Sequence, residues 1–177
     1  MNIFTIPGLY NSGPQHWHTH WENKYGFSRI QQLEWEKPVC EAWLSTIEDY
    51  LHSFSDDEIV LIGHSLGCNA IVRWAQKYQH KIAGALLVGP SDVDAPIYPE
   101  GTNGFKPMPL NKLDFPSMVI ASSNDEYVSI ERASQFASNW GSTFIDIGPL
   151  GHINSASNLG EWPEGYAYLQ QLIKADR

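Results

Sequence analysis

A serine inside the run GHSLG at residues 63–67 is the residue in this sequence best suited to covalent chemistry. The run follows the aliphatic stretch 59–62 and leads into a stretch with helical spacing from Cys68, so G-x-S-x-G stands between a buried strand and a helix. In that setting the chain turns too sharply for side chains at either glycine, and the hydroxyl of Ser65 is exposed at the tip. A tight turn with an unreactive serine is the alternative; the flanking strand and helix favour a nucleophile.

A serine hydroxyl becomes a good nucleophile only when a base removes its proton, and the sequence offers seven histidines for that task. His152 follows the strand predicted at 143–147. Loops at the carboxyl ends of parallel strands face the ligand side of an open α/β sheet, so this loop is able to reach Ser65. The sequence therefore favours His152 as the general base over a role as a solvent-exposed loop histidine.

The acid that orients such a base is expected after another strand end, between the serine and the histidine in the chain. Asp125 meets both conditions, because it follows the strand predicted at 116–121. Its carboxylate would fix the tautomer of His152 and stabilise the imidazolium. Glu126, its neighbour, and Asp92, after the preceding strand, are alternatives for the same role.

An oxyanion intermediate needs two N–H donors in addition to the triad. The backbone N–H of Leu66, the residue after the nucleophile, is predicted to be one of them. The loop after the first strand is expected to supply the other, and Leu9 is the best placed, with Tyr10 as the alternative.

Other histidines raise the question of a metal site. His16, His18 and His20 alternate, and His16 and His20 would share a face of a helix. No carboxylate or cysteine clusters beside them, so no metal and no cofactor is predicted. His64, the variable position within the motif, is expected to pack beside the site.

Composition limits the classes of function. A chain of 177 residues with 42% apolar residues is expected to form one domain, residues 1–177, with a real core. The net charge of −9 and the lack of a basic cluster argue against nucleic acid or an anionic membrane as a partner. A small acyl substrate is the expected partner, and nothing indicates a protein partner.

Cysteine usage and the chain start predict the environment. Cys40 and Cys68 belong to no metal or redox motif, so both are expected to be reduced and buried. The first residues lack the features of a signal peptide, and no apolar stretch approaches the ~20 residues that span a bilayer. A cytoplasmic location is therefore expected.

Strand-like and helix-like stretches alternate along the chain, which predicts an α/β fold with a doubly wound, mostly parallel sheet and helices on both faces. Six strands are predicted, at 2–6, 28–35, 59–62, 82–88, 116–121 and 143–147. Helices are predicted around 16–25, from Pro38 to 54, and at 68–79, 130–140 and 162–174.

The stretch 91–115 is the one irregular region, and its four prolines and its length leave two interpretations. It forms either a lid or pocket wall, or a plain surface loop. The seven tryptophans are expected to be mostly core residues, with one or two lining an acyl pocket.

With these residues assembled, the chain resembles the small serine hydrolases of the α/β-hydrolase superfamily, the type of retinoblastoma-binding protein 9 and bacterial YdeN. The resemblance covers essentially the whole length. It is carried by the IPG loop at 6–8, His16-Trp17, GHSLG, SSNDEYV at 122–128 and GHINSASNLGEWPEG at 151–165.

The resemblance implies a compact, capless α/β-hydrolase core and catalytic roles for Ser65, Asp125 and His152. It does not extend to retinoblastoma binding, because the chain has no L-x-C-x-E motif. The expected function is that of a serine hydrolase acting on a small ester, thioester or amide, most simply a carboxylesterase. A weakly catalytic binding module and a small peptidase or amidase are the alternatives.

Overall fold

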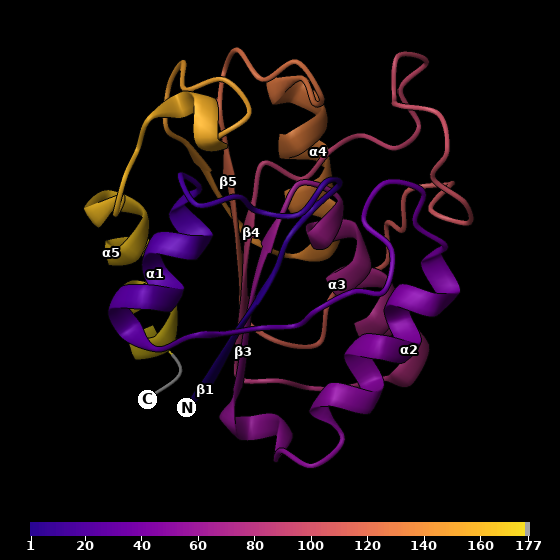
Figure 1. Cartoon of the computed structure of the whole chain (residues 1–177), viewed down its shortest axis with the longest axis vertical. Coiled ribbons are helices and arrows are strands. Elements are labelled where there is room, and N and C mark those ends of the chain that lie inside the picture. Colours follow the sequence, from indigo (N-terminus) through magenta and orange to yellow (C-terminus); the bar gives the residue numbers. More distant parts are fainter. Residues whose placement is uncertain (176–177) are drawn as a thin grey trace.

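Six parallel strands run through the middle of the protein in the order β2-β1-β3-β4-β5-β6 (Figure 1). The computed structural model describes residues 1–175. The strands are β1 (Asn2–Ile6), β2 (Ser28–Arg29), β3 (Ile59–His64), β4 (Gly84–Val88), β5 (Ser117–Ala121) and β6 (Thr143–Asp146). Each neighbouring pair is parallel, which confirms the predicted doubly wound sheet.

Helices cover both faces of this sheet. They are α1 (Trp17–Tyr25), α2 (Cys40–Leu51), α3 (Leu66–Tyr78), α4 (Ile130–Trp140) and α5 (Pro163–Ala175), with 3₁₀ turns η1 (Asp56–Glu58) and η2 (Ser155–Ser157). Figure 1 shows α1 and α5 together on one side, with α2 and α3 on the other. The two apolar cores agree with this division, since one contains residues of α2, α3 and α4 and the other contains residues of α1 and α5.

The central strands β3, β4 and β5 lie between two layers of helices, which explains their continuous apolar sequences. Every residue of β3, β4 and β5 is buried, because helices lie over both faces. Strands buried on both faces need continuous apolar runs rather than alternation. The edge strands lack that protection, and β6 has no buried residue along its length.

The second strand is much shorter than the predicted 28–35. Only Ser28 and Arg29 pair with β1, opposite Phe4 and Thr5. The apparent alternation misled the prediction, because Leu33 is 91% exposed and contributes to no buried face. Two helix starts also differ slightly from prediction: α2 begins at Cys40 rather than Pro38, and α3 begins at Leu66, directly after the motif serine.

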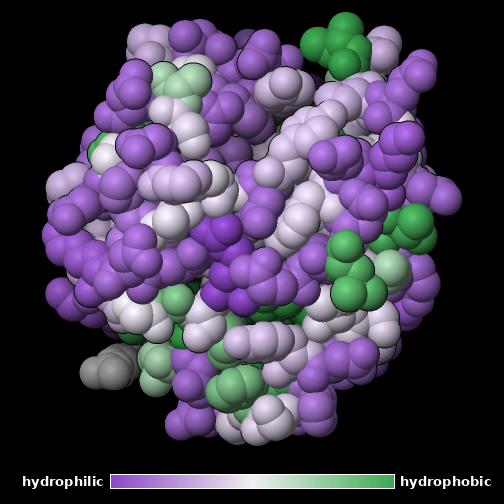
Figure 2. Space-filling model, viewed as in Figure 1, coloured by the Kyte–Doolittle hydropathy of each residue, from purple (hydrophilic) through white to green (hydrophobic). Residues whose placement is uncertain are grey.

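The surface carries few large apolar groups. The face in Figure 2 is mostly hydrophilic, with hydrophobic side chains in small, separate groups. Both cysteines are buried and free, as predicted. No helix within residues 1–175 is long and apolar enough to cross a bilayer.

Candidate active site

The turn between β3 and α3 holds Ser65 in an unusual backbone conformation. Its φ is 56° and its ψ is −123°, a region that non-glycine residues adopt only under strain of about 1–3 kcal/mol. A Cβ at Gly67 would lie 2.0 Å from the carbonyl oxygen of Ile6, and a Cβ at Gly63 would lie 2.8 Å from Ile71 Cδ1. The two motif glycines are therefore required for close approach, as predicted, while the serine itself carries the positive φ.

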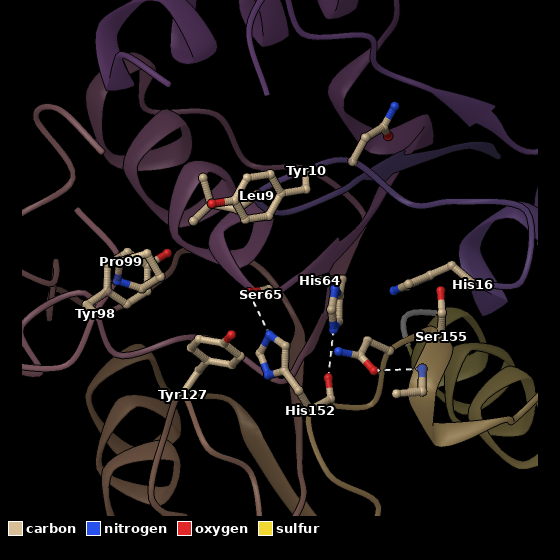
Figure 3. A pocket seen from close by; sticks show the side chains of 13 residues that line it. Leu9, Tyr10, His16, His64, Ser65, Tyr98, Pro99, Tyr127, His152 and Ser155 are labelled. Carbon is tan, nitrogen blue, oxygen red and sulfur yellow. Dashed lines mark hydrogen bonds between the residues drawn. The ribbon is translucent and has the colours of Figure 1, made fainter. Parts of the chain in front are cut away.

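Three residues from three strand ends meet at this turn. His152 Nε2 lies 2.8 Å from Ser65 Oγ (Figure 3), and His152 Nδ1 lies 2.8 Å from Asp125 Oδ2 and 2.9 Å from Oδ1. The Asp125 side chain is fully buried and that of His152 is 7% exposed. The structure thus joins the three predicted side chains in one chain of hydrogen bonds.

The competing acids have other positions. Asp92 forms an ion pair with Arg132, at 2.7 Å between Oδ2 and Nε and 3.1 Å between Oδ1 and Nη2. Glu126 points to solvent. Because neither has a hydrogen bond to His152 and Asp125 has two short contacts to it, the geometry selects Asp125.

The loop after β1 lies directly against Ser65. A Cβ added to Gly8 would be 2.8 Å from Ser65 Cβ and 3.1 Å from the backbone nitrogen of Leu66. The N–H of Tyr10 donates to the carbonyl of Trp35 at 3.0 Å, so it is already occupied. Within residues 1–175, the N–H groups of Leu9 and Leu66 donate to no protein acceptor, which favours this pair as oxyanion donors.

Two side chains, His64 and Trp17, donate hydrogen bonds to the loop that carries His152. His64 Nε2 donates to the backbone carbonyl of His152 at 2.9 Å, and the indole N–H of Trp17 donates to the carbonyl of Ile153 at 2.8 Å (Figure 3 shows the first). Burial, with the nearby His16 and His152, holds the pKa of His64 well below its ordinary value. His64 was predicted to pack beside the site; the backbone contact gives no signal in the sequence.

His16 lies behind His64 and caps a helix rather than belonging to one. Its Nδ1 accepts the backbone N–H of His18 at 3.1 Å, at the start of α1. The expectation that His16 and His20 share a helix face is therefore wrong. Burial, with smaller contributions from Arg29 and neighbouring histidines, lowers the pKa of His16 to about 3. Among residues 1–175, no His, Cys, Asp and Glu group is arranged to hold a metal ion.

A pocket of about 370 Å³ opens over Ser65. Its walls consist of Leu9, Tyr10, Asn11, His16, His64, Ser65, Tyr98, Pro99, Tyr127, His152, Asn154, Ser155 and Ala156. Tyr98 and Pro99 belong to the stretch 91–115, which therefore acts as a pocket wall. The expectation that a tryptophan lines an acyl pocket is wrong, because tyrosines take that place and the tryptophans pack against the sheet and its helices.

Sequence reasoning missed several wall residues. Asn154, Ser155 and Ala156 come from the stretch that follows His152, and η2 places them beside the base. The distinctive run at 151–165 was the available signal, although nothing in it specified contact with the pocket. Asn11 had no comparable signal.

Comparisons with known proteins identify the family and the fold. Residues 3–171 match the model of a family described as serine hydrolase. A solved structure from Pectobacterium atrosepticum, assigned as a YdeN-like hydrolase, is 31% identical with a TM-score of 0.87, over 99% of this chain and 91% of that one. No match was found among curated proteins.

Two more distant structures share the fold. The ydeN product of B. subtilis is 22% identical with a TM-score of 0.80, covering 97% of this chain and 98% of that one. A thermophilic esterase from Thermogutta terrifontis is 17% identical with a TM-score of 0.69, covering 99% and 90%. The family match spans nearly all of the described residues, and the YdeN resemblance is confirmed. The chain therefore belongs to the serine hydrolase family and has the α/β-hydrolase fold.

Proposed function

We propose that this protein is a carboxylesterase that cleaves small esters through an acyl-enzyme on Ser65. The observation that carries the proposal is the unbroken series of contacts from Asp125 through His152 to Ser65, each 2.8 Å long, at the floor of an open pocket. Such a series allows a neutral hydroxyl to attack a carbonyl at ordinary pH.

In the proposed first half-reaction, His152 Nε2 takes the hydroxyl proton while Ser65 Oγ bonds to the carbonyl carbon. The carbonyl electron pair moves to oxygen, and the N–H groups of Leu9 and Leu66 are its donors. Asp125 accepts the Nδ1 proton of His152 in a hydrogen bond and stabilises the imidazolium. The imidazolium then protonates the alcohol oxygen as the ester C–O bond breaks, which leaves an acyl-serine.

The second half-reaction repeats these roles with water. His152 takes a proton from water as its oxygen bonds to the acyl carbon, and the new oxyanion uses the same two donors. Collapse breaks the bond to Ser65 Oγ, which recovers its proton from His152. The carboxylic acid then leaves the pocket.

The pocket wall favours esters over peptides with a free amino terminus. A substrate with an α-ammonium group needs a carboxylate partner when it is desolvated. None of the residues that line the pocket is Asp, Glu, Lys or Arg. Burial also lowers the pKa of His16 to about 3, so the wall remains uncharged there at neutral pH. Thioesters and uncharged amides fit the same wall but differ in their leaving groups.

Labelling with a fluorophosphonate tests the nucleophile. Ser65 Oγ is expected to displace fluoride and form a stable phosphonate ester, detected as a mass increase on the peptide that contains Ser65. Ser65→Ala is expected to abolish labelling, while Ser123→Ala, an exposed serine outside the pocket, is expected to leave it unchanged. Folded protein that takes up no label would refute the proposed function.

A substrate panel tests the class. p-Nitrophenyl esters with short acyl groups are expected to turn over much faster than aminoacyl amides of similar size. The reverse order would indicate a peptidase. A purely binding role would be favoured by a blocked pocket with Ser65 far from His152, and neither condition holds here.

A further inference from the structure

The pocket has two chemically different ends. Figure 3 shows Tyr98, Pro99 and Tyr127 on one side of Ser65, with His64, His16 and Ser155 on the other. The first group forms an apolar, aromatic wall. We call the second region the polar end and define it by four residues: Asn11, His16, Asn154 and Ser155.

The amide of Asn11 has a fixed orientation. Its Oδ1 accepts from Arg29 Nη1 at 2.9 Å and from the backbone N–H of Ser12 at 2.8 Å. The Nδ2 group donates to no acceptor within residues 1–175, so its two N–H bonds are free for a ligand. The guanidinium also polarises the amide, which makes these N–H groups stronger donors.

Asn154 repeats this arrangement on the opposite loop. Its Oδ1 accepts the backbone N–H of Ala156 at 3.0 Å, which caps η2. The Nδ2 group of Asn154 again donates to no acceptor in the described part of the chain. In both asparagines, the side-chain oxygen accepts hydrogen bonds from the protein, and the side-chain N–H groups are left to bind a ligand.

His16 adds a third donor, which is almost fully buried. Its Nδ1 accepts the N–H of His18, so the proton of the neutral ring is on Nε2. Among the residues that the structure describes, that Nε2 has no hydrogen-bond partner, and His16 is 3% exposed. The neighbouring His64 offers no such donor to the pocket, because its Nε2 donates to the carbonyl of His152 and its Nδ1 is therefore an acceptor.

The surrounding charges favour electron-rich groups. Arg29 lies directly behind Asn11, and His16 marks the amino terminus of α1, where the helix carries partial positive charge. Glu22 pairs with Arg29 at 2.7 Å but does not line the pocket. No carboxylate side chain faces the polar end from the pocket wall.

We infer that the polar end is a binding subsite for acceptor oxygens, so that the preferred substrate is an ester carrying a second carbonyl or carboxylate group. The amide groups of Asn11 and Asn154 and the buried His16 Nε2–H are its donors. The aromatic wall holds the apolar part of the same molecule. This inference rests on the proposed function, since Ser65 must be the reacting atom between the two ends.

Boronic acids provide a direct probe, because Ser65 Oγ bonds to boron and the single carbon substituent is free to enter either end. A series of ω-carboxyalkylboronic acids with increasing chain length is compared as inhibitors of p-nitrophenyl ester hydrolysis. Each acid is paired with its methyl ester and with an alkylboronic acid in which isopropyl replaces the carboxyl group. At the best chain length, the acid or its ester is expected to inhibit at least about tenfold more tightly than the isopropyl analogue.

Isosteric variants identify the donors. Asn154→Asp retains the oxygen that caps η2 but replaces the free N–H groups with a carboxylate oxygen, and Asn11→Asp does the same beside Arg29. Either variant is expected to abolish or reverse the preference for the carboxyl compound, with little change for the isopropyl analogue. Asn158→Asp is the matched control, because this exposed residue lies near η2 but outside the pocket.

The outcomes separate the possible failures. Equal inhibition by all three compounds in the wild type, with fluorophosphonate labelling intact, overturns the subsite and leaves the esterase proposal standing. A preference that both Asp variants retain also overturns it. Loss of labelling itself overturns both proposals. If the methyl ester equals the acid, the subsite recognises a neutral carbonyl; if the acid is tighter, it recognises a carboxylate.

Discussion

Asp125 meets one nitrogen of His152 through both of its carboxylate oxygens, so the ring must carry a proton on that Nδ1 and present a lone pair at Nε2 to Ser65. This is the tautomer that a general base requires. At the scale of single residues, the meeting of Ser65, Asp125 and His152 was predicted from their types and their positions after strands. The donors Asn11 and Asn154 were not, because the free side of an amide depends on tertiary bonds that the sequence does not reveal.

Asp125→Asn tests the orienting role. The amide retains the shape but loses the charge and favours the wrong tautomer, so kcat is expected to fall by about 10³–10⁴ with little change in KM. Steady-state hydrolysis of a p-nitrophenyl ester measures both constants. Asp92→Asn is the matched control: it weakens the ion pair with Arg132 and is expected to leave kcat largely intact. Equal losses in the two variants would contradict the assignment.

His64→Leu removes the N–H that supports the backbone of His152. A displaced base reduces rate more than binding, so kcat is expected to fall by about 10–100-fold with KM nearly unchanged. Gln places an amide nitrogen near the same position, and His64→Gln is expected to recover most of the rate. Thermal melts of both variants separate this effect from a loss of folding, and a rate unaffected by Leu would count against the role.

Between elements, the contact of β1 with the start of α3 sets the shape of the site. The carbonyl oxygen of Ile6 lies where a side chain of Gly67 would be, and the next residues of that loop reach Ser65. The strand-turn-helix unit was predictable because the motif requires both neighbours. The short length of β2 was not predictable, because neither of its two residues is apolar and buried.

Gly67→Ala forces a methyl group against the backbone of β1. The fold must shift to relieve an approach of 2.0 Å, so the free energy of unfolding is expected to fall by at least about 2–3 kcal/mol. Urea denaturation measures this loss. Gly13→Ala is the control, since a Cβ there meets nothing within 4 Å, and its effect is expected to stay within about 0.5 kcal/mol. Similar midpoints for both variants would refute the clash.

The buried histidines at the start of α1 and the end of β3 make stability depend on pH. Burial lowers the pKa of His16 from its ordinary value of 6.5 to about 3. Between these two pKa values, His16 binds a proton in the unfolded chain but not in the folded one. The folding stability that is present above pH 6.5 is therefore lost as the pH falls toward 3. His16 alone contributes up to about 1.4 kcal/mol per pH unit in that window. His18 and His64, whose pKa values burial also lowers, act in the same direction.

His16→Asn tests this linkage, because Asn caps helices well and does not titrate. The fall in the free energy of unfolding between pH 6 and pH 4, measured by urea denaturation, is expected to be shallower than in the wild type by about one proton. An unchanged slope would show that His16 is protonated in the folded protein.

Across the whole molecule, the segment 91–115 is where the core and the pocket meet. It is anchored to α3 by Arg73, which donates to the carbonyl of Phe105 at 2.7 Å, and to α4 by Trp140, which donates to that of Pro109 at 2.7 Å. In the same segment, Tyr98 lines the pocket, and its hydroxyl lies 3.3 Å from Ser91 Oγ. The sequence left a lid or pocket wall and a plain surface loop as alternatives for this segment, and it gave no sign of the anchors, since prolines indicate an irregular path but not what it contacts. The cytoplasmic location remains a prediction from the sequence.

Tyr98→Ala tests whether this wall limits the acyl group. Removing a ring that is 7% exposed enlarges the apolar end, so kcat/KM for longer p-nitrophenyl esters is expected to rise about tenfold relative to the acetate ester. Tyr98→Phe preserves the ring, although it loses the contact with Ser91, and is expected to retain the wild-type order. An unchanged order in the Ala variant would place the limit elsewhere.

The hydrogen bond from Trp17 to Ile153 has a consequence for protein synthesis. The ribosome makes Ser65 and the loop after β1 well before it makes His152 and Ile153, the residue whose carbonyl accepts from Trp17. A nascent chain that ends between these residues therefore contains the proposed nucleophile but lacks the proposed base. Under the proposed function, hydrolytic activity is expected only after the loop with His152 has been made and packs against α1, so chains that end before this loop are expected to be inactive.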